Sequence, residues 1–259
     1  MHVAVFQSCT AGLTPADRLE LLDDRLADAD TGLLVCPELF MSGYAIGQNI
    51  RAYAEPADGA FAAGIAQLAR KHATAVVYGY PEVCGDSIFN TAQCIDASGQ
   101  RIANHRKLVL PPGFEADYFT TGNGLTLFEL DSMRFSLVIC YDAEFPETVR
   151  AAANAGTQAI VVPTATGAQW GVVANRVMPA RAFENGIYVL YANHAGKEGD
   201  LDYLGASCII GPDGNDLARA TDTEALISAE INQSHVKAAQ TRLPYLRDLH
   251  KLRPRLNSP

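Results

Sequence analysis

The stretch LVICYDAEFPE, residues 137–147, shows where a buried strand of this chain ends and what it delivers there. Its apolar first part predicts a strand in the core, and a cysteine, an aromatic residue, two acids and a proline follow in close order. Carboxylates near a thiol raise its pKa and suppress the thiolate that does chemistry. Cys140 is therefore either an inert core residue or a reactive thiol that depends on a cation from elsewhere in the sequence.

Predicted helices and strands alternate along the chain, which is typical of an α/β fold. Thr14 and Pro15 have the residue types of an N-cap and a first helical position, and the helix they open is expected to run to about Ala29. Ser234 is expected to cap a last helix, and the tail at 252–259 is polar and broken by proline. The remaining helices are expected within 59–72, 146–156 and 171–185, and the strands within 2–8, 32–38, 74–83, 88–108, 125–140, 158–165, 187–196, 205–220 and 224–232.

A weak internal repeat suggests how these elements are layered. AQCIDASGQRIA (92–103) resembles ASCIIGPDGNDLA (206–218) with one residue inserted, and each follows an aromatic-rich strand. The two segments are either similar hairpins by chance or matching parts of two pseudo-symmetric α/β halves. The second alternative places two sheets face to face with helices outside, which is a four-layer α-β-β-α sandwich. No linker divides the halves, so we expect a single domain over 1–259, with a tail from about 244 extending from it.

Composition excludes several classes of protein. The chain has 259 residues, of which 48% are apolar and 19% charged, as expected for a compact globular protein. Its net charge is −9 and no basic stripe is visible, which argues against a nucleic-acid partner. No apolar run approaches the roughly 20 residues of a membrane span, and the N-terminal segment is expected to be a strand, not a signal peptide. The six cysteines have no CxxC or zinc-like spacing, which favours free thiols in a reducing cytoplasm and no metal site.

A reactive Cys140 would need a base and a cation. His105 and His194 end predicted strands, so a Cys-His dyad is one alternative. Glu38 directly follows a buried strand, where burial would raise its pKa toward neutrality and suit a general base, unless it is a loop acid that points to water. Lys107 stands at the end of a predicted strand beside three apolar residues (108–110), and its ammonium either reaches solvent or needs anionic partners inside.

Glu38, Lys107 and Cys140 would supply one another with the charge partners and the base that they need if their side chains lie close together. Glu38, Lys107 and Cys140 each lie at or just past the carboxyl end of a predicted strand, where α/β sheets usually carry their sites. A lysine between the glutamate and the cysteine would lower the pKa of the thiol and could hydrogen-bond a developing oxyanion. The sequence therefore predicts that these side chains converge in one pocket.

Three ordered blocks of sequence resemble the nitrilase, or carbon–nitrogen hydrolase, superfamily. The blocks are LLVCPELFMSGY (33–44), NHRKLVLPPGFEADYFTTGN (104–123) and LVICYDAEFPETVRAAANAGTQAIVVPTA (137–165). Two further family-like stretches follow, RAFENGIYVLYANHAG (181–196) and GASCIIGPDGNDLARA (205–220). The resemblance covers nearly the whole chain and implies the same α-β-β-α sandwich, and with it homo-oligomers built on a dimer.

The resemblance also implies roles for individual residues. Cys140 stands at the nucleophile position, Glu38 at that of the general base and Lys107 at that of the triad lysine. Glu115 matches a second glutamate that positions the lysine and the substrate, and the backbone N–H of Tyr141 would join Lys107 in binding the oxyanion. The implied reaction hydrolyses an amide through a thioester on the cysteine, without a metal or a cofactor.

The residues after the cysteine bear on the branch of the superfamily. The resemblance implies a triplet CWE at this point in true nitrilases. This chain has CYD at residues 140–142, which favours amides over nitriles as substrates. Glu144 replaces an arginine typical of the omega-amidase branch, so we expect small neutral or cationic carboxamides, such as amino acid amides, as substrates. In the alternative, Glu144 faces away and pairs with an arginine such as Arg181.

The walls of the pocket and two rival functions complete the prediction. Aromatic residues that border the three blocks are candidate walls, each of which could equally belong to the core: Tyr44, Tyr118, Phe119 and Trp170.

The main rival function is that of an N-carbamoyl hydrolase with the same triad, which would release carbon dioxide as well as ammonia. A rival from another class is a catalytically silent member that acts as a binding protein.

Overall fold

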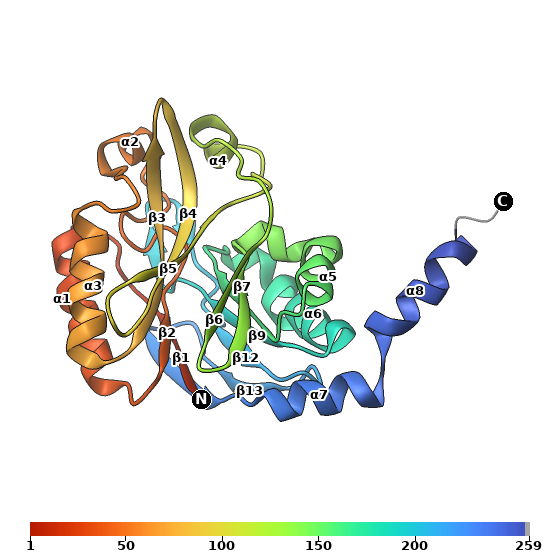
Figure 1. The fold of residues 1–259 in the computed structure, drawn as a ribbon. Coiled ribbons are helices and arrows are strands. Elements are labelled where there is room, and N and C mark those ends of the chain that lie inside the picture. The colour runs from red at the N-terminus through yellow and green to blue at the C-terminus, as the bar shows by residue number, and fades with distance from the viewer. Residues whose placement is uncertain (257–259) are drawn as a thin grey trace.

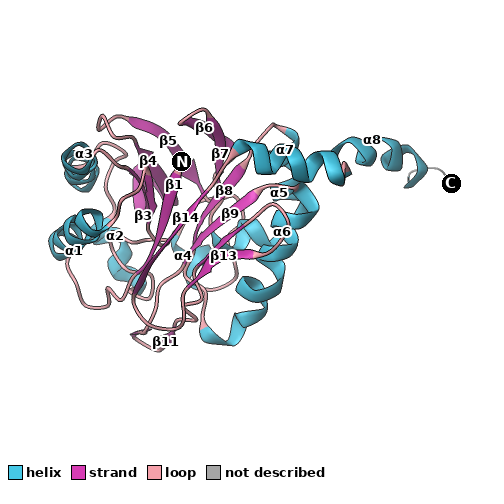
Figure 2. Ribbon diagram, turned by 90° about the horizontal axis from the view of Figure 1, so that it is seen from below, coloured by secondary structure: helices cyan, strands magenta, loops and turns pink. Residues whose placement is uncertain are grey.

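Two six-stranded sheets lie face to face in the computed structural model, which describes residues 1–256, and helices cover the outer face of each sheet (Figures 1 and 2). The first sheet has, in spatial order, β14 (Ala225–Glu230), β1 (His2–Gln7), β2 (Leu33–Val35), β3 (Ala75–Cys84), β4 (Ser87–Ile95) and β5 (Arg101–Arg106). The second has β13 (Asp216–Arg219), β12 (Cys208–Ile210), β9 (Tyr188–Ala192), β8 (Ala159–Pro163), β7 (Met133–Leu137) and β6 (Thr126–Leu130). The predicted four-layer α-β-β-α sandwich is confirmed.

The two sheets have the same pattern of pairing. From β14 to β5 the successive pairs are antiparallel, parallel, parallel, antiparallel and antiparallel, and from β6 to β13 the order is identical. The hairpin β4–β5 thus corresponds to β12–β13, and these are the hairpins that contain the weak sequence repeat. The repeat therefore reflects two pseudo-symmetric halves and not a chance likeness.

The core lies between the sheets and is supplied by alternate residues of their central strands. Val3 and Val35 from the first sheet pack with Leu137, Val161 and Leu190 from the second, and all are fully buried. The central strands β2, β8 and β9 are buried along their whole length, because a helix layer covers the face that the other sheet does not. Such continuous apolar strands are typical of parallel sheets covered on both sides.

Corresponding helices cover the outer faces. The first sheet carries α1 (Pro15–Asp28) and α3 (Ala60–His72), and the second carries α5 (Pro146–Asn154) and α6 (Met178–Asn185) (Figure 2). Thr14 caps α1 as predicted, with Asp17 completing a capping box. Gly186 ends α6 with a φ of 61°, a left-handed conformation that favours glycine, and a π-helical turn over Val173–Val177 precedes this helix.

The C-terminal region differs from the sequence prediction. Asn232, not Ser234, caps α7 (Gln233–Arg242), because its side chain accepts from the backbone N–H of Ser234. The tail is not broken by proline: it forms α8 (Tyr245–Leu256), which runs through Pro254 and projects from the body (Figure 1). The amphipathic pattern of α8 outweighs the cost of a proline inside the helix.

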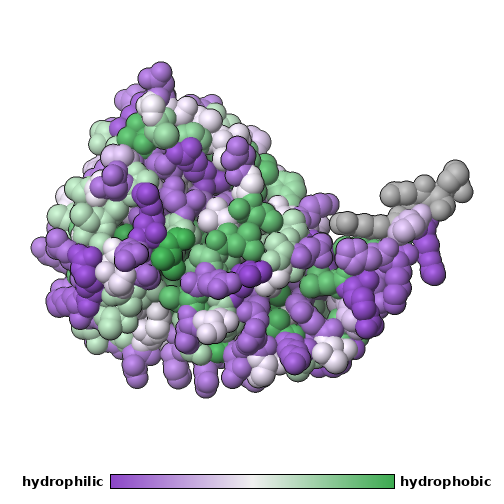
Figure 3. All heavy atoms as spheres, viewed as in Figure 1, coloured by the Kyte–Doolittle hydropathy of each residue, from purple (hydrophilic) through white to green (hydrophobic). Residues whose placement is uncertain are grey.

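Short elements and the surface complete the fold. The shorter helices and strands are η1 (Gly47–Asn49), α2 (Ile50–Tyr53), α4 (Phe114–Tyr118), η2 (Cys140–Glu144), η3 (Ala168–Trp170), β10 (Lys197–Glu198) and β11 (Leu201–Asp202). The face seen in Figure 3 is mostly hydrophilic, with hydrophobic residues in scattered patches. Among the helices within residues 1–256, none has the length and apolar character needed to cross a bilayer.

Candidate active site

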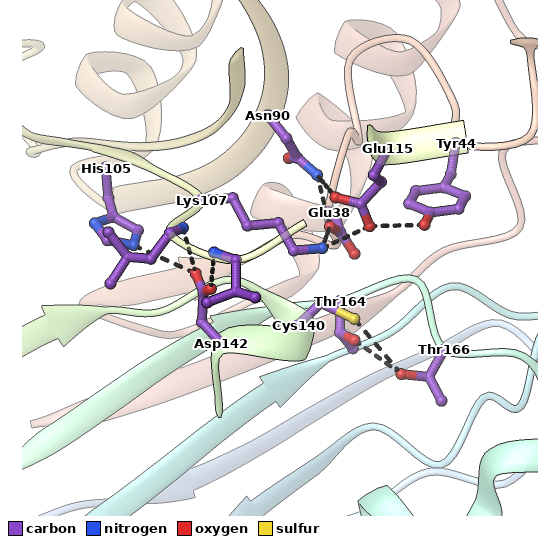
Figure 4. Close-up of polar contacts among 12 residues, drawn as sticks. Glu38, Tyr44, Asn90, His105, Lys107, Glu115, Cys140, Asp142, Thr164 and Thr166 are labelled. Carbon is purple, nitrogen blue, oxygen red and sulfur yellow. Dashed lines mark hydrogen bonds and ion pairs between the residues drawn. The ribbon is translucent and has the colours of Figure 1, made fainter. Parts of the chain in front are cut away.

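Glu38 is held inside the molecule just past β2. Its side chain is fully buried, and its Oε1 accepts from Asn90 Nδ2 and from Lys107 Nζ, both at 2.7 Å (Figure 4). Its Oε2 has no hydrogen-bond partner among the described residues. Burial raises the pKa of Glu38 to about 7, with Lys107 lowering it and Glu115 raising it. A carboxylate with one free oxygen and a pKa near neutrality suits a general base.

Lys107 follows β5 and does not reach solvent. Its ammonium is fully buried and donates to Glu115 Oε1 at 2.6 Å as well as to Glu38. Burial opposes the charge on Lys107, but attraction by Glu38 and Glu115 raises the pKa above its ordinary value. The backbone N–H of Lys107 bonds to the carbonyl of Asn90 at 2.8 Å, which fixes where the side chain starts. The snorkelling alternative is therefore wrong for this lysine.

Glu115 in α4 and Asn90 in β4 complete the charged cluster. Glu115 Oε1 also accepts from the hydroxyl of Tyr44 at 2.7 Å, and its Oε2 accepts from Asn90 Nδ2 at 3.0 Å. Asn90 thus touches both carboxylates with one amide group. Asn90 was not predicted as a site residue, although a polar residue in the buried run IFNTA indicates a structural or functional role.

Cys140 ends the strand segment that follows β7. Its φ is 44°, a strained left-handed conformation for a residue with a side chain, and the 3-10 helix η2 begins at it. A sharp turn therefore follows the strand, and α5 starts at Pro146, as the sequence predicts. The sulfur lies 3.9 Å from Thr166 Oγ1 and lines a cavity of about 500 Å³.

Lys107 lowers the pKa of the Cys140 thiol less than the sequence suggests. Burial and the charge of Glu38 raise the pKa of Cys140 to about 12, while Lys107 lowers it. Lys107 lowers the pKa of the thiol, as predicted, but the effects of burial and of Glu38 are larger. The thiol is therefore protonated at neutral pH, and its proton has to be removed as it attacks.

Asp142 ties the cysteine turn to the lysine segment. It is fully buried, and its two oxygens accept separately from the backbone N–H of Leu108, at 3.1 Å, and of Val109, at 2.8 Å (Figure 4). Asp142 lies two residues after Cys140, and Leu108 directly follows Lys107. One carboxylate therefore joins the second sheet's cysteine to the first sheet's lysine.

Two of the four predicted wall residues line the cavity beside Cys140, and two do not. Tyr44 and Trp170 line it, as do Tyr141 and Glu144. Tyr118 does not, because its ring packs against Phe114 with the centroids 5.4 Å apart. The remaining candidate wall, Phe119, is buried in that same aromatic cluster.

Glu144 is not paired in the way the alternative required. Arg181 donates to the backbone carbonyl of Glu144 at 2.6 Å and to that of Ala143 at 3.1 Å, and its ion pair is with Glu184. The Glu144 side chain lines the cavity, and burial raises its pKa, with Lys107 and Arg181 lowering it. A carboxylate thus stands at the wall of the same cavity as the thiol.

The two candidate histidines are engaged elsewhere. His105 Nδ1 lies 3.1 Å from Thr126 Oγ1, and its Nε2 lies 3.8 Å from Asp142. His194 lies between Ser8 Oγ, at 3.2 Å, and the carbonyl oxygen of Glu38, at 2.7 Å. These partners leave no observed contact between either ring and the sulfur. Within residues 1–256, no group of three or more His, Cys, Asp or Glu residues is arranged to hold a metal ion.

Comparison with known proteins identifies the family. The model of the family described as carbon-nitrogen hydrolase matches residues 14–241. A curated relative from Pseudomonas protegens, named "Hydrolase in pqqF 5'region", is 42% identical and covers 96% of this chain and 88% of its own. An (R)-stereoselective amidase from a Pseudomonas species is 33% identical, over 85% of this chain and 80% of its own.

Solved structures agree with this result. An active-site mutant of the amidase from Nesterenkonia AN1, a member of the nitrilase superfamily, has a TM-score of 0.87 at 32% identity and covers 97% of this chain and 96% of its own. Another structure of that amidase, with a TM-score of 0.86 at 32% identity over 97% of this chain and 95% of its own, has the acetamide moiety of fluoroacetamide added covalently at the active site cysteine. Likeness over this length shows that the present chain belongs to the carbon–nitrogen hydrolase family of the nitrilase superfamily and is a hydrolase of carbon–nitrogen bonds.

Proposed function

We propose that this hydrolase is an amidase that converts small carboxamides to carboxylates and ammonia, with Cys140 as nucleophile, Glu38 as general base and Lys107 and Glu115 as supporting charges. The single observation that carries the proposal is the fully buried Glu38–Lys107–Glu115 cluster, because it stands next to a partly exposed cysteine that lines a cavity. Buried ionisable groups with perturbed pKa values in a cleft are typical of active sites. The covalent adduct at the active site cysteine of the Nesterenkonia amidase supports the same role for Cys140.

In the first half of the reaction, Glu38 takes the thiol proton as Cys140 attacks the amide carbonyl carbon. The carbonyl electron pair moves to oxygen, and the oxyanion is stabilised by the ammonium of Lys107 and the backbone N–H of Tyr141. The oxyanion then collapses, the carbon–nitrogen bond breaks, and Glu38 returns the proton to the leaving ammonia. Each such oxyanion donor typically contributes on the order of 100-fold or more in rate.

The second half releases the acid. A water molecule gives a proton to Glu38 and attacks the thioester carbonyl, and the same two donors hold the second oxyanion. Collapse breaks the carbon–sulfur bond and releases the carboxylic acid, and Glu38 returns its proton to the sulfur. Glu38 thus begins and ends the cycle ionised, which agrees with a pKa near neutrality.

The preferred substrates are neutral or cationic amides. Glu144 lines the cavity and the ion pair of Arg181 is with Glu184, so an anionic substrate would meet an unneutralised carboxylate. Trp170 and Leu201 offer apolar contacts in the same cavity, where a hydrocarbon side chain could lie. An amino acid amide has both an ammonium and a side chain, so it can meet Glu144 and the apolar wall together.

The test is a panel of substrates with the full-length protein and Cys140→Ala. We expect ammonia release from aliphatic amides and amino acid amides, little from nitriles, and none with Cys140→Ala, whose circular dichroism should match that of the wild type. Full activity in Cys140→Ala would refute the nucleophile. Equimolar carbon dioxide from N-carbamoyl amines, with no turnover of simple amides, would instead favour the carbamoyl hydrolase.

We also propose that the protein assembles as a homo-oligomer built on a dimer. Exposed apolar side chains on neighbouring helices support this, because Phe183 of α6 and Tyr245 and Leu252 of α8 are 39%, 42% and 47% exposed. Light scattering on the purified protein should give at least twice the 27.7 kDa of one chain. A monomer at micromolar concentration would contradict this part of the proposal.

A further inference from the structure

Three hydroxyl groups form a connected cluster next to the sulfur of Cys140. Thr166 Oγ1 lies 2.7 Å from the hydroxyl oxygen of Tyr191 and 2.9 Å from Thr164 Oγ1, and Thr164 lies 3.4 Å from Tyr191. Tyr191 and Thr164 are fully buried, and Thr166 is 6% exposed. Thr166 is the member of the cluster that lines the cavity, and its Oγ1 lies 3.9 Å from the sulfur (Figure 4). Thr164 also hydrogen-bonds the thiol.

The backbone of Thr166 is fixed by a buried amide. Asn193 Oδ1 accepts from the N–H of Thr166 at 2.9 Å, and Asn193 Nδ2 donates to the carbonyl of Thr166 at 3.1 Å and to that of Gly205 at 2.9 Å. Asn193 is itself fully buried. Because both the N–H and the carbonyl of Thr166 are bonded to Asn193, the backbone of Thr166 is fixed. Its hydroxyl is therefore preorganised and needs no rearrangement to meet a charge that forms at the sulfur.

The hydrogen-bond inventory gives Thr166 a proton for the sulfur. A hydroxyl has one donor and two acceptor sites. Thr164 donates to the hydroxyl of Tyr191, and Tyr191 is placed to donate to Thr166, which leaves the proton of Thr166 free. Thr166 can give that proton to Thr164 Oγ1 or to Cys140 Sγ, and a negative charge that forms on the sulfur favours Cys140.

We propose that Thr166 is a catalytic hydrogen-bond donor, which stabilises the negative charge on Cys140 sulfur while Glu38 removes the thiol proton. The inference rests on the proposed function, because it needs Cys140 as nucleophile. It adds to that function a second source of stabilisation for the sulfur, supplied by the segment after β8 and by Tyr191 of β9 and independent of Lys107.

The charges around the thiol explain why such a donor is needed. The ionisable groups that face the sulfur or its cavity are Glu38, Glu115, Glu144, Lys107, Tyr44, Tyr141 and Tyr191. Three of them are carboxylates and one is a cation, which is already bonded to two of the carboxylates. Charge alone therefore disfavours a thiolate here, in agreement with the raised pKa of Cys140. Hydrogen bonds to a charged group are worth more than those between neutral groups.

The test replaces the hydroxyl and keeps the shape. In Thr166→Val, we expect alkylation of Cys140 by iodoacetamide, followed by peptide mass spectrometry, to slow about tenfold between pH 7 and 10. Because the rate follows the thiolate fraction, the plot of log rate against pH should move about one unit to higher pH. For a small amide substrate, kcat should fall at least tenfold while KM changes less than about threefold, as expected for an interaction made mainly in the transition state.

Three further variants separate this role from a structural one. Thr166→Ser keeps the hydroxyl and should restore both rates to within about threefold of the wild type. Tyr191→Phe removes one donor to Thr166 and should cause a smaller loss in the same direction. Thr74→Val is the matched control, because it removes a buried threonine hydroxyl that bonds Thr31 and His72 carbonyls, away from the cavity. It should lower stability and leave kcat and alkylation unchanged.

The outcomes separate this inference from the proposed function. Wild-type alkylation and turnover in Thr166→Val would overturn the inference, and so would a Thr166→Ser protein as slow as Thr166→Val. If Thr166→Val is unchanged while Cys140→Ala is inactive, only the role of Thr166 fails. If Cys140→Ala retains turnover, the proposed nucleophile fails instead.

Discussion

Lys107 Nζ and Glu38 Oε1 lie 2.7 Å apart with both side chains fully buried. A charge removed from water is costly unless it is paired and hydrogen-bonded. Here one ammonium serves two carboxylates, because Glu115 is 2.6 Å from the same nitrogen. With both carboxyls ionised, the cluster would carry a net negative charge. Burial and the charge of Glu115 disfavour the ionised form of Glu38 and raise its pKa to about 7.

Removing the ammonium should destabilise the fold. Lys107→Met leaves Glu38 and Glu115 buried without a counter-charge, and we expect the free energy of unfolding to fall by about 3–5 kcal/mol at pH 8. The loss should shrink near pH 5, because the carboxyls can then take up protons. Urea denaturation at the two pH values measures both effects.

Lys71→Met is the matched control for that experiment. Lys71 lies 2.6 Å from Asp23, but their side chains are 59% and 31% exposed. Exposed ion pairs contribute about 0–1 kcal/mol, so this variant should change stability little. Equal losses in the two variants would contradict the account of the buried cluster.

The pH dependence of activity should report Glu38. A general base works only when ionised, so kcat/KM should fall as pH drops through about 7, where Glu38 takes up a proton. Glu38→Gln should lower kcat at least 100-fold, the usual range for loss of a general base. Rates of amide hydrolysis between pH 5 and 9 check this. A flat profile down to pH 5 in the wild type would exclude Glu38 as the base.

The sequence predicted the parts of the site that interrupt its apolar pattern. Glu38, Lys107 and Cys140 each lie just past the carboxyl end of a strand, where α/β sheets usually carry their sites. Asn90 and Thr166 were missed, because a single polar residue in or after a buried strand does not reveal which groups it will face. Tyr118 was misplaced for a related reason: aromatic side chains beside a site pack equally well into a core.

Fold predictions succeeded where the signals in the sequence act locally, and they failed near the C-terminus. Helix α1 follows from Thr14 and Pro15, whose effects are local. The cap of α7 was misplaced by two residues, because Asn232 and Ser234 both have side chains that cap helices and only the direction of the preceding chain decides between them. Helix α8 was missed because Pro254 outweighed the helical spacing of leucines in the pattern.

Asp142→Asn should separate activity from folding. The substitution keeps the shape of the side chain but turns one acceptor into a donor that faces the N–H of Leu108 or Val109. The lysine segment should then shift relative to Cys140, and a shift of about 1 Å can cost on the order of 100-fold in rate. We expect kcat to fall at least tenfold, with KM within about threefold of the wild type.

Glu82→Gln provides the comparison for Asp142→Asn. Glu82 is 3% exposed and bonds Thr91, Asn104 and Arg106, with none of the catalytic groups among these partners. It should lower the melting temperature without changing kcat. If Asp142→Asn loses activity only in proportion to its fraction unfolded, the carboxylate holds the fold and does not position the lysine.

Stability in acid should depend on His194. Burial lowers the pKa of His194 to about 4, whereas an unfolded histidine has a pKa near 6.5. The neutral ring therefore stabilises the fold above pH 6.5, and this contribution is lost as pH falls from 6.5 toward 4, by at most about 1.4 kcal/mol per pH unit. His194→Gln should lose less stability than the wild type over this range in urea denaturation, and His250→Gln on α8 should follow the wild type. Parallel curves for the wild type and His194→Gln would contradict the lowered pKa.

Substrate charge should be sensed by Glu144. The carboxylate lines the cavity, and Arg181 donates to the backbone of Glu144 rather than to its side chain. Glu144→Gln removes the negative charge and nearly keeps the size, so kcat/KM should fall about tenfold for an amino acid amide and stay within about twofold for an uncharged aliphatic amide of similar length. An amide that carries a carboxylate should improve, because its repulsion by Glu144 is gone. The ratio of kcat/KM values for the cationic and anionic amides is the decisive quantity, since it cancels any general loss of activity. If that ratio is unchanged in Glu144→Gln, or if the wild type prefers the anionic amide, Glu144 does not set the substrate class, and the search for that determinant moves to Trp170 and Leu201 on the cavity wall.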